Sequence, residues 1–476
     1  MLARCGGLSD AHVQVPGSTA LTTLATIDAF LRERGLSPEI PVRLECANTV
    51  PGALVLLALV ARGTTLILVP PGSSSSCPGF IGAQLRLHGE SHLAADPLDP
   101  ERCLEITVVD APKPLPEASP LRQGHILLRT SGSLGAPKLV VHSHAGLLAN
   151  ASNAVDRLAL RADDRVLLPV PLAHMYGLGA GLLPALFAGA SVDILDAANL
   201  LRYLERERKL RPTVAFLTPN LCTTLLRPRA ATEQYRHVVV AGDKLSPETF
   251  AAAEAIYHRV VNLYGSTEMG VIAAADARTP HSPTTVGRPL PGVALRVRPT
   301  LDGDPGRSSV GELLCAHPYG FVGYVDDSGA PLPRPDDDGW YATRDLADLT
   351  PDGELEVLGR CDHAVKRDGR LVMLADIERA LERLPGVDRA AAVVVGETLR
   401  GRGIVVYCTL QAAHPLDPAD LRQTCRALLP AYAVPDEFRV LPALPLLPGG
   451  KLDRHALHRD ALSSRQQADH EYGHHA

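Results

Sequence analysis

The sequence contains no cysteine pattern of the kind that holds a structural metal or a disulfide framework. Its nine cysteines are scattered along 476 residues without a Cys-x-x-Cys pair, so neither a zinc ribbon nor a network of disulfides is expected. The N-terminus also lacks the basic segment and apolar stretch of a secretory signal. We therefore expect a cytoplasmic protein with reduced thiols.

The sequence shows no feature for binding nucleic acid or entering a membrane. The net charge is −6 and no run of Lys and Arg occurs, so neither partner has an electrostatic footprint here. The longest apolar stretch, residues 50–71, is interrupted by Arg62 and Gly63, and it predicts a buried helix over 54–61 and a strand over 65–69. The absence of Gly-x-Ser-x-Gly argues against a serine hydrolase.

The sequence does contain a regular alternation of helical and strand patterns. Between residues 21 and 263 this alternation predicts α/β layering, and the small residues of 178–187 predict a tightly packed helix. After Gly287, short strands separated by Gly, Pro and Asp indicate a β-rich subdomain. After Arg360, new helix and strand patterns indicate a separate small α+β unit.

These patterns predict an α/β protein with a large N-terminal domain, residues 1–360, and a small C-terminal domain, residues 361–462. Residues 463–476 are polar and rich in histidine, and we expect a disordered tail. Metal binding by His470, His474 and His475 is the alternative for this tail.

Residues 130–138 lie between two expected strands, 125–128 and 139–142, and read Thr130-Ser131-Gly132-Ser133-Leu134-Gly135-Ala136-Pro137-Lys138. A loop of this composition offers backbone N–H groups, hydroxyls and one cation, which suits a chain of phosphates. It is not a Walker loop, because Lys138 does not complete a Gly-x-x-x-x-Gly-Lys-Ser/Thr pattern. Taken alone, the segment could equally be an ordinary turn.

Four further segments follow it in a fixed order. They are Tyr264-Gly265-Ser266-Thr267-Glu268, Thr343-Arg344-Asp345-Leu346, the run from Gly359-Arg360-Cys361-Asp362 to Lys366-Arg367-Asp368-Gly369, and Pro448-Gly449-Gly450-Lys451-Leu452-Asp453-Arg454. Together with residues 130–138 they closely resemble the adenylate-forming superfamily, which includes acyl-CoA synthetases, adenylation domains of nonribosomal peptide synthetases, and luciferases. The resemblance runs over nearly the whole chain, and it is closest to the stand-alone aryl-acid adenylating enzymes.

The resemblance implies a ligase that uses ATP and Mg²⁺ to convert a carboxylate to an acyl-AMP. Catalysis there is chiefly positioning and neutralisation of charge at phosphorus. Lys451 would bridge the α-phosphate and the carboxylate, Thr267 would bind the α-phosphate, and Glu268 would hold Mg²⁺. The other groups expected at the nucleotide are Thr130, Ser131, Gly132, Ser133 and Lys138 at the phosphates, Tyr264 at adenine, Asp345 and Arg360 at the ribose, and Gly242, Asp243, Lys244 and Gly265 nearby.

The resemblance also implies a hinge. Asp362 falls where the family keeps the pivot of its small mobile domain, and rotation there would exchange Lys451 for the loop around Lys366 and Gly369 to form a thiol tunnel. The chain departs from the family pattern at three positions. Leu134 replaces a residue with a hydroxyl group, which puts one phosphate contact in doubt. Arg344 replaces a glycine and Leu371 replaces an arginine, and these two changes put the approach to the ribose and the thiolation step in doubt.

The expected acid pocket begins at the segment from Pro171 to Tyr176. In relatives that activate α-amino acids an aspartate stands at the place of Met175 and pairs with the ammonium, and a buried ammonium facing a thioether would be uncompensated. Relatives that choose a 2-hydroxybenzoate carry an asparagine there. An aryl or other compact acid without an α-amino group is therefore expected, with a pocket of Met175, Tyr176, Leu178, Phe216, Thr218, Ala241 and Met269.

Some roles stay open at this point. His174 is either a pocket gate or a core histidine, and Asp243 and Lys244 either bind a substituent or pair with each other. The ending around Lys451 resembles that of peptide-synthetase adenylation domains, which favours the phosphopantetheine thiol of an acyl or peptidyl carrier protein as acceptor. Free CoA, an amine giving an amide, and an inactive homologue that serves as a binding protein are the alternatives.

Overall fold

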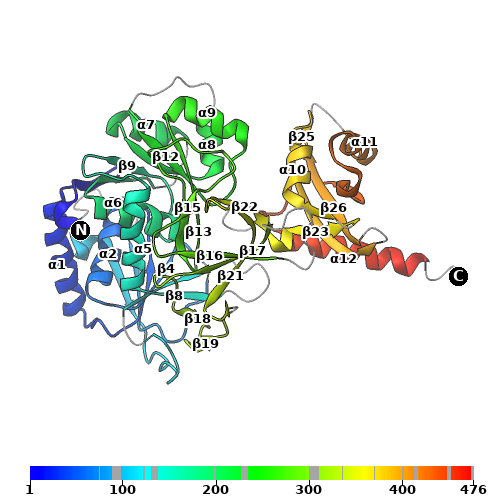
Figure 1. Ribbon diagram of the computed structural model, residues 1–476. Helices are drawn as coiled ribbons and strands as arrows, with labels where there is room; N and C mark the ends of the chain where they lie inside the picture. The colour runs from blue at the N-terminus through cyan, green and yellow to red at the C-terminus, as the bar shows by residue number, and fades with distance from the viewer. Residues whose placement is uncertain are drawn as a thin grey trace. The chain divides into compact units, whose positions relative to one another are not determined.

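The computed structural model describes residues 1–476 except 74, 88–97, 122–123, 130–137, 197–199, 227–233, 300–309, 335, 369, 399–400, 412–415, 447–451 and 473–476. The fold is mixed α/β with two large sheets, which confirms the predicted fold class (Figure 1). No helix among these described residues is both long and apolar enough to cross a bilayer.

The largest sheet has nine strands, and six neighbouring strands in its centre are parallel. Parallel strands buried on both faces need continuous apolar runs, and β9, β11 and β12 supply them. In spatial order the strands are β15 (Arg288–Pro289), β14 (Gly270–Ala274), β13 (Val260–Ser266), β12 (His237–Val240), β11 (Val214–Leu217), β9 (Arg165–Leu168), β10 (Ser191–Ile194), β1 (Gly7–Ser9) and β2 (Gln14–Val15).

The second large sheet has eight strands and a parallel centre, β7, β4, β3 and β5. Its strand β18 pairs antiparallel with β8 and brings residues 323–325 beside residues 139–141. In spatial order the strands are β19 (Pro331–Leu332), β18 (Gly323–Val325), β8 (Leu139–Ser143), β7 (His125–Arg129), β4 (Leu66–Val69), β3 (Val42–Glu45), β5 (Ala83–Leu87) and β6 (Leu104–Val108).

Two five-stranded sheets follow. One contains β16 (Ala294–Pro299), β17 (Val310–Ala316), β20 (Asp336–Asp337), β21 (Trp340–Leu349) and β22 (Leu355–Arg360), as the β-rich texture after Gly287 predicts. The other contains β23 (Ala364–Arg367), β24 (Arg370–Met373), β25 (Val387–Thr398), β26 (Gly401–Leu410) and β27 (Glu437–Val440).

Most helices begin at a side chain that caps them. Thr49, Ser143, Thr218 and Ser246 each accept a hydrogen bond from a backbone N–H of the first turn, which satisfies a donor that the helix itself cannot pair. The α-helices are α1 (Gly17–Glu33), α2 (Val50–Ala61), α4 (Pro100–Cys103), α5 (His144–Arg157), α6 (Leu183–Ala188), α7 (Leu200–Leu210), α8 (Pro219–Leu225), α9 (Pro247–Tyr257), α10 (Leu374–Glu382), α11 (Pro418–Leu428) and α12 (Arg454–Tyr472). They are accompanied by the short 3-10 helices η1 (Leu2–Arg4), η3 (Cys361–His363) and η4 (Ala431–Ala433) and the π-helix η2 (Tyr176–Leu182).

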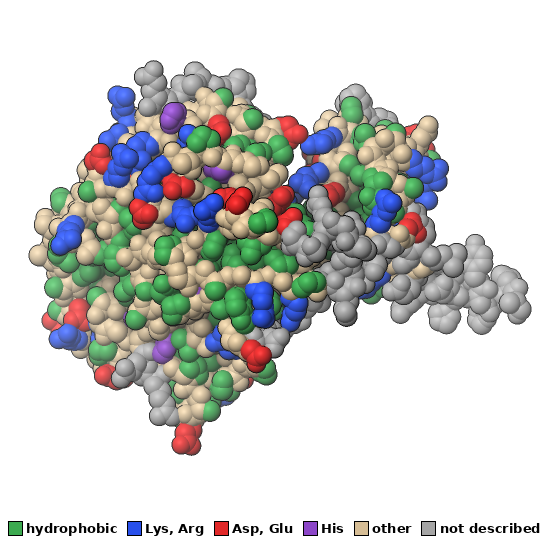
Figure 2. All heavy atoms as spheres, viewed as in Figure 1, with side chains coloured by type: hydrophobic (Ala, Val, Ile, Leu, Met, Phe, Trp, Pro, Cys, Tyr) green, Lys and Arg blue, Asp and Glu red, His purple; other side chains and the backbone are tan. Residues whose placement is uncertain are grey.

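Helices α7, α8 and α9 lie beside β12 in Figure 1 and bury one core against the nine-stranded sheet. On the face shown in Figure 2, Lys and Arg side chains are interspersed with Asp and Glu. This mixture agrees with the small net charge.

The chain divides into two compact units. The first contains Met1–Leu295, Cys315–Tyr341 and Pro351–Glu356, and the second contains Arg296–Leu314, Ala342–Thr350 and Val357–Ala476. The second unit thus takes in segments that lie before residue 360. A mobile domain that begins at residue 361 stays a prediction.

Two local expectations need correction. The helix predicted over 178–187 is present, but its first part, η2, is a π-helix, and only Leu183–Ala188 is α-helical. Residues 463–472, predicted as disordered tail, continue helix α12 to Tyr472. Leu457 and Ala461 of α12 are buried in a core, and extending an already formed helix is much easier than nucleating one.

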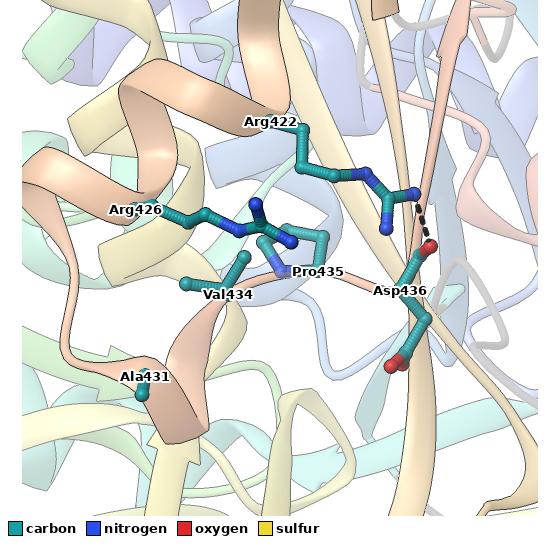
Figure 3. A pocket seen from close by; sticks show the side chains of 6 residues that line it. All are labelled: Arg422, Arg426, Ala431, Val434, Pro435 and Asp436. Carbon is teal, nitrogen blue, oxygen red and sulfur yellow. Dashed lines mark hydrogen bonds between the residues drawn. The ribbon is translucent and has the colours of Figure 1, made fainter. Parts of the chain in front are cut away.

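The second unit contains a buried ion pair. Arg367 is fully buried and donates to Asp436 Oδ1 at 2.7 Å and to the carbonyl of Val434 at 2.9 Å. Asp436 Oδ2 accepts from the backbone of Ile404, and its carbonyl accepts from Arg422. Asp436 and Arg422 also line a cavity of about 350 Å³ with Arg426, Ala431, Val434 and Pro435 (Figure 3).

Replacement of Asp436 by alanine is expected to lower the free energy of unfolding by about 3 kcal/mol, because it leaves the Arg367 charge buried without its partner. Chemical denaturation followed by circular dichroism measures this change. The matched control is Asp376→Ala, which breaks an exposed pair with Arg379 and should cost no more than about 1 kcal/mol. Equal losses in both variants would contradict the role given to burial.

Candidate active site

The predicted pocket and nucleotide residues of the first unit gather along one edge of the nine-stranded sheet. Thr218 follows β11, Ala241 to Lys244 follow β12, and Tyr264 to Glu268 form the end of β13 and the turn after it. These strands are neighbours and parallel, so their carboxyl ends meet, and this is the edge where α/β sheets bind ligands. The sheet order therefore brings these segments together.

The turn that carries Glu268 is held by three consecutive backbone carbonyls. His142 Nε2 lies 2.6 Å from the oxygen of Thr267, Phe321 N–H donates to that of Glu268 at 2.8 Å, and His317 Nε2 lies 2.9 Å from that of Met269. Both histidines must carry a proton on Nε2 to donate to a carbonyl. Burial lowers the pKa of His142 to about 4 and also lowers that of His317, so both rings are neutral near pH 7.

The carboxylate of Glu268 accepts a hydrogen bond at Oε1 from the hydroxyl of Tyr324, at 2.8 Å. The hydroxyl of Tyr341 lies 3.4 Å from that of Tyr324. Burial first, and then the negative charge of Glu268, raise the pKa of Tyr341, so this phenol stays protonated. Lys138 Nζ stands 5.2 Å from the centre of the Tyr324 ring.

The side chains predicted for the acid pocket differ in their burial and in their hydrogen-bond partners. Met175, Leu178, Phe216, Ala241 and Met269 are buried, and Thr218 caps α8. The hydroxyl of Tyr176 donates to the carbonyls of Leu217 and Val239 at 3.0 and 2.9 Å, and its ring packs edge-on against Phe216. Tyr176 is thus anchored to the ends of β11 and β12.

Met175 packs against the backbone of η2. A Cβ placed on Gly179 would lie 2.6 Å from Met175 Sδ, so the thioether fits only because Gly179 has no side chain. His174 is exposed, which excludes its interpretation as a core histidine. Asp243 and Lys244 are exposed as well, and the Asp243 carboxylate accepts from the backbone N–H of Lys244 at 2.7 Å.

The predicted ribose pair lies in the second unit. Arg360 Nη1 lies 3.4 Å from Asp345 Oδ1 and donates to the carbonyl of Thr343 at 3.2 Å. The Thr343 hydroxyl accepts from the backbone of Asp345. Arg344, where the family has glycine, adopts φ +61°, a left-handed conformation that glycine reaches more easily than arginine. This explains why the family favours glycine there.

Several predicted residues lie outside the described part of the chain. These are Thr130, Ser131, Gly132, Ser133, Gly369 and Lys451, and the side chains of Asp362 and Lys366. The strand β8 that follows the phosphate segment is described, as is Lys138, which is exposed at its start.

Sequence reasoning missed His142, His317, Tyr324 and Tyr341. Each lies outside the motif that carries Glu268, and their contacts with it span 48 to 125 residues for the histidines and Tyr324. A usable signal was the alternation in β8, because Lys138, Val140 and His142 share one face of a strand.

Comparison with known proteins agrees with this geometry. Residues 81–325 match the AMP-binding enzyme family, and residues 376–451 match the AMP-binding enzyme C-terminal domain. The chain belongs to this family of adenylate-forming enzymes. The resemblance inferred from the five motifs is thereby confirmed.

The relatives that this chain resembles include both peptide synthetases and CoA ligases. Over 90% of this chain, the sequence is 30% identical to CymA of Salinispora arenicola, a probable non-canonical nonribosomal peptide synthetase. It is 32% identical to the sulfoacetate–CoA ligase of Cupriavidus necator, over 72% of this chain and 68% of that protein. The crystal structure of ATP-bound MatB from Rhodopseudomonas palustris shows the same fold, with a TM-score of 0.80 over 95% of both chains at 22% identity.

The chain spans only part of several relatives. It covers 6% of the length of CymA, and 35% and 41% of two other peptide synthetases. In those proteins the matching region is one segment of a much longer polypeptide.

Proposed function

We propose that this chain activates a carboxylic acid with ATP. In the first step a carboxylate oxygen attacks the α-phosphorus, the bond to the β-phosphate oxygen breaks, and pyrophosphate leaves. The observation that carries the proposal is the arrangement around Tyr324, where the Glu268 carboxylate and the Lys138 ammonium, 130 residues apart in the sequence, contact the same side chain. An anion and a cation held in one place suit a metal–triphosphate.

The donor set around Glu268 fits magnesium. The described residues contain no group of three or more His, Cys, Asp or Glu side chains that could hold a metal. A single carboxylate is what Mg²⁺ needs, because it binds nucleotide sites through one or two carboxylates together with water and phosphate oxygens. Bound there, Mg²⁺ would neutralise phosphate charge, while Glu268 orients it, Asp345 and Arg360 bind the ribose, and Lys138 and Lys451 bind phosphate oxygens.

The acid we propose is an aryl or other compact carboxylic acid without an α-amino group. Position 175 carries a buried methionine, and a buried ammonium beside it would lack a charged partner. Leu178, Phe216 and Met269 would supply an apolar wall, and exposed His174 would stand at its entrance.

The acceptor we propose is the phosphopantetheine thiol of a carrier protein. Its sulfur attacks the acyl carbonyl, AMP leaves and a thioester forms. The resemblance of residues 446–457 to peptide-synthetase endings and the similarity to CymA favour this acceptor. Free CoA is the second candidate, favoured by the similarity to a sulfoacetate–CoA ligase.

Two assays test these steps separately. Acid-dependent exchange of labelled pyrophosphate into ATP, over aryl, heteroaryl, aliphatic and α-amino acids, tests adenylation. Incubation of the best acid with ATP and either CoA or a phosphopantetheinylated carrier protein, followed by mass spectrometry, identifies the acceptor. ATP binding without exchange for any acid would instead support an inactive homologue.

A further inference from the structure

The environment of Tyr324 explains how its hydroxyl is aimed. Strand β18 pairs with β8 so that Tyr324 lies opposite Val140, between Lys138 and His142 on the same face of β8. The Tyr324 ring packs edge-on against Phe321 at 4.9 Å between ring centres, and Phe321 packs in the same way against Tyr341 at 5.3 Å. Both tyrosines are only 6% exposed, so neither ring can turn away without disrupting this packing.

Tyr324 makes two separable contacts. Its hydroxyl donates to Glu268 Oε1, and its ring face lies under Lys138 Nζ. A hydrogen bond to a carboxylate is stronger than one between neutral groups, and a cation over an aromatic face is attracted by the ring electrons. One side chain therefore restrains both the acidic and the basic group of the proposed nucleotide site.

The backbone of the Glu268 turn is restrained independently. His142, Phe321 and His317 bind the carbonyls of residues 267, 268 and 269 in turn. The turn therefore has little freedom of its own, and the remaining freedom lies in the side chain of Glu268. Tyr324 restricts that freedom.

We propose that Tyr324 is a positioning residue for metal and nucleotide: its hydroxyl fixes the Glu268 carboxylate for a divalent cation, and its ring holds Lys138 toward the phosphates. This inference rests on the proposed function for the identity of the ligand. It adds Tyr324, with Tyr341 behind it, to the groups that prepare the site before ATP arrives. Preorganisation of this kind lowers the entropic cost of ordering these side chains when the ligand binds.

Two substitutions distinguish the effect of the Tyr324 hydroxyl from that of its ring. Tyr324→Phe removes the hydroxyl and keeps the ring, so the Mg²⁺ concentration for half-maximal pyrophosphate exchange is expected to rise about tenfold. ATP affinity measured in EDTA should not change. Tyr324→Leu removes the ring as well, so it should also weaken ATP binding in EDTA, about threefold.

The chain supplies a matched control. Tyr235 donates to Glu207 at 2.6 Å and lies 3.0 Å from the Tyr203 hydroxyl, so it repeats the Tyr–Tyr–Glu arrangement in the core under α7. Tyr235→Phe should change the melting temperature without changing the Mg²⁺ dependence. A shift of Mg²⁺ dependence in Tyr235→Phe equal to that in Tyr324→Phe would mean that general destabilisation causes both, and would overturn the proposal.

A binding measurement separates this inference from the proposed reaction. Electron paramagnetic resonance of free Mn²⁺ reports binding of Mn²⁺–ATP without turnover. Weaker Mn²⁺–ATP binding in Tyr324→Phe than in the wild type supports the positioning role, even if no acid supports exchange and the proposed reaction fails. Equal binding in the two proteins, or wild-type binding of ATP that Mn²⁺ does not strengthen, overturns it.

Discussion

Lys451→Ala is expected to slow acid-dependent pyrophosphate exchange by about 100- to 1000-fold, the usual loss when one preorganised donor to a developing oxyanion is removed. The resemblance to adenylate-forming enzymes implies that this lysine would neutralise charge between the α-phosphate and the carboxylate. Among the proposed groups, Lys451 is the one assigned to the space between the α-phosphate and the carboxylate. Exchange rates at saturating ATP and acid measure the loss.

The same variant should retain the second half-reaction. Supplied with chemically synthesised acyl-AMP, Lys451→Ala should form thioester at the wild-type rate, because the hinge that the resemblance implies at Asp362 would move Lys451 away for that step. Lys209→Ala, which removes an exposed lysine of α7, is the control and should leave both reactions unchanged. Wild-type exchange by Lys451→Ala would remove the basis of the proposed mechanism.

Glu268→Gln is expected to reduce pyrophosphate exchange by about 100-fold at fixed Mg²⁺, because an amide oxygen is a much weaker ligand for a hard cation than a carboxylate. The glutamine oxygen can still accept from the Tyr324 hydroxyl, so the fold should be preserved. Exchange measured against Mg²⁺ concentration should show the deficit, together with an unchanged melting temperature.

The control for this variant is Glu205→Gln, at an exposed position of α7. It removes the same charge far along the chain from the Glu268 turn and should leave the Mg²⁺ dependence as in the wild type. An unaltered Mg²⁺ dependence in Glu268→Gln would show that the metal is held by other groups. It would also contradict the positioning role proposed for the Tyr324 hydroxyl.

Local sequence was sufficient for most elements of the first unit. The strands expected over 65–69, 125–128 and 139–142 are present as β4, β7 and β8, because short apolar runs of this kind suit buried strands. Local patterns failed where the tertiary environment decides. In the π-helical segment η2, a Cβ on Gly177 would clash with the carbonyl oxygen of Pro171, so the backbone there packs too closely for any other residue, and no periodicity encodes that contact.

The sequence by itself determined the family, because five motifs in a fixed order each carry a chemical requirement, and it named Glu268 and Lys138 as charged groups of one site. Only the tertiary structure decided how they are held. The pairing of β18 with β8 places Tyr324 beside Lys138, and packing of His142 and His317 against the turn fixes Glu268. Pairing between strands far apart in the chain is set by the whole sheet, so these supporting residues have no signature within their own segments.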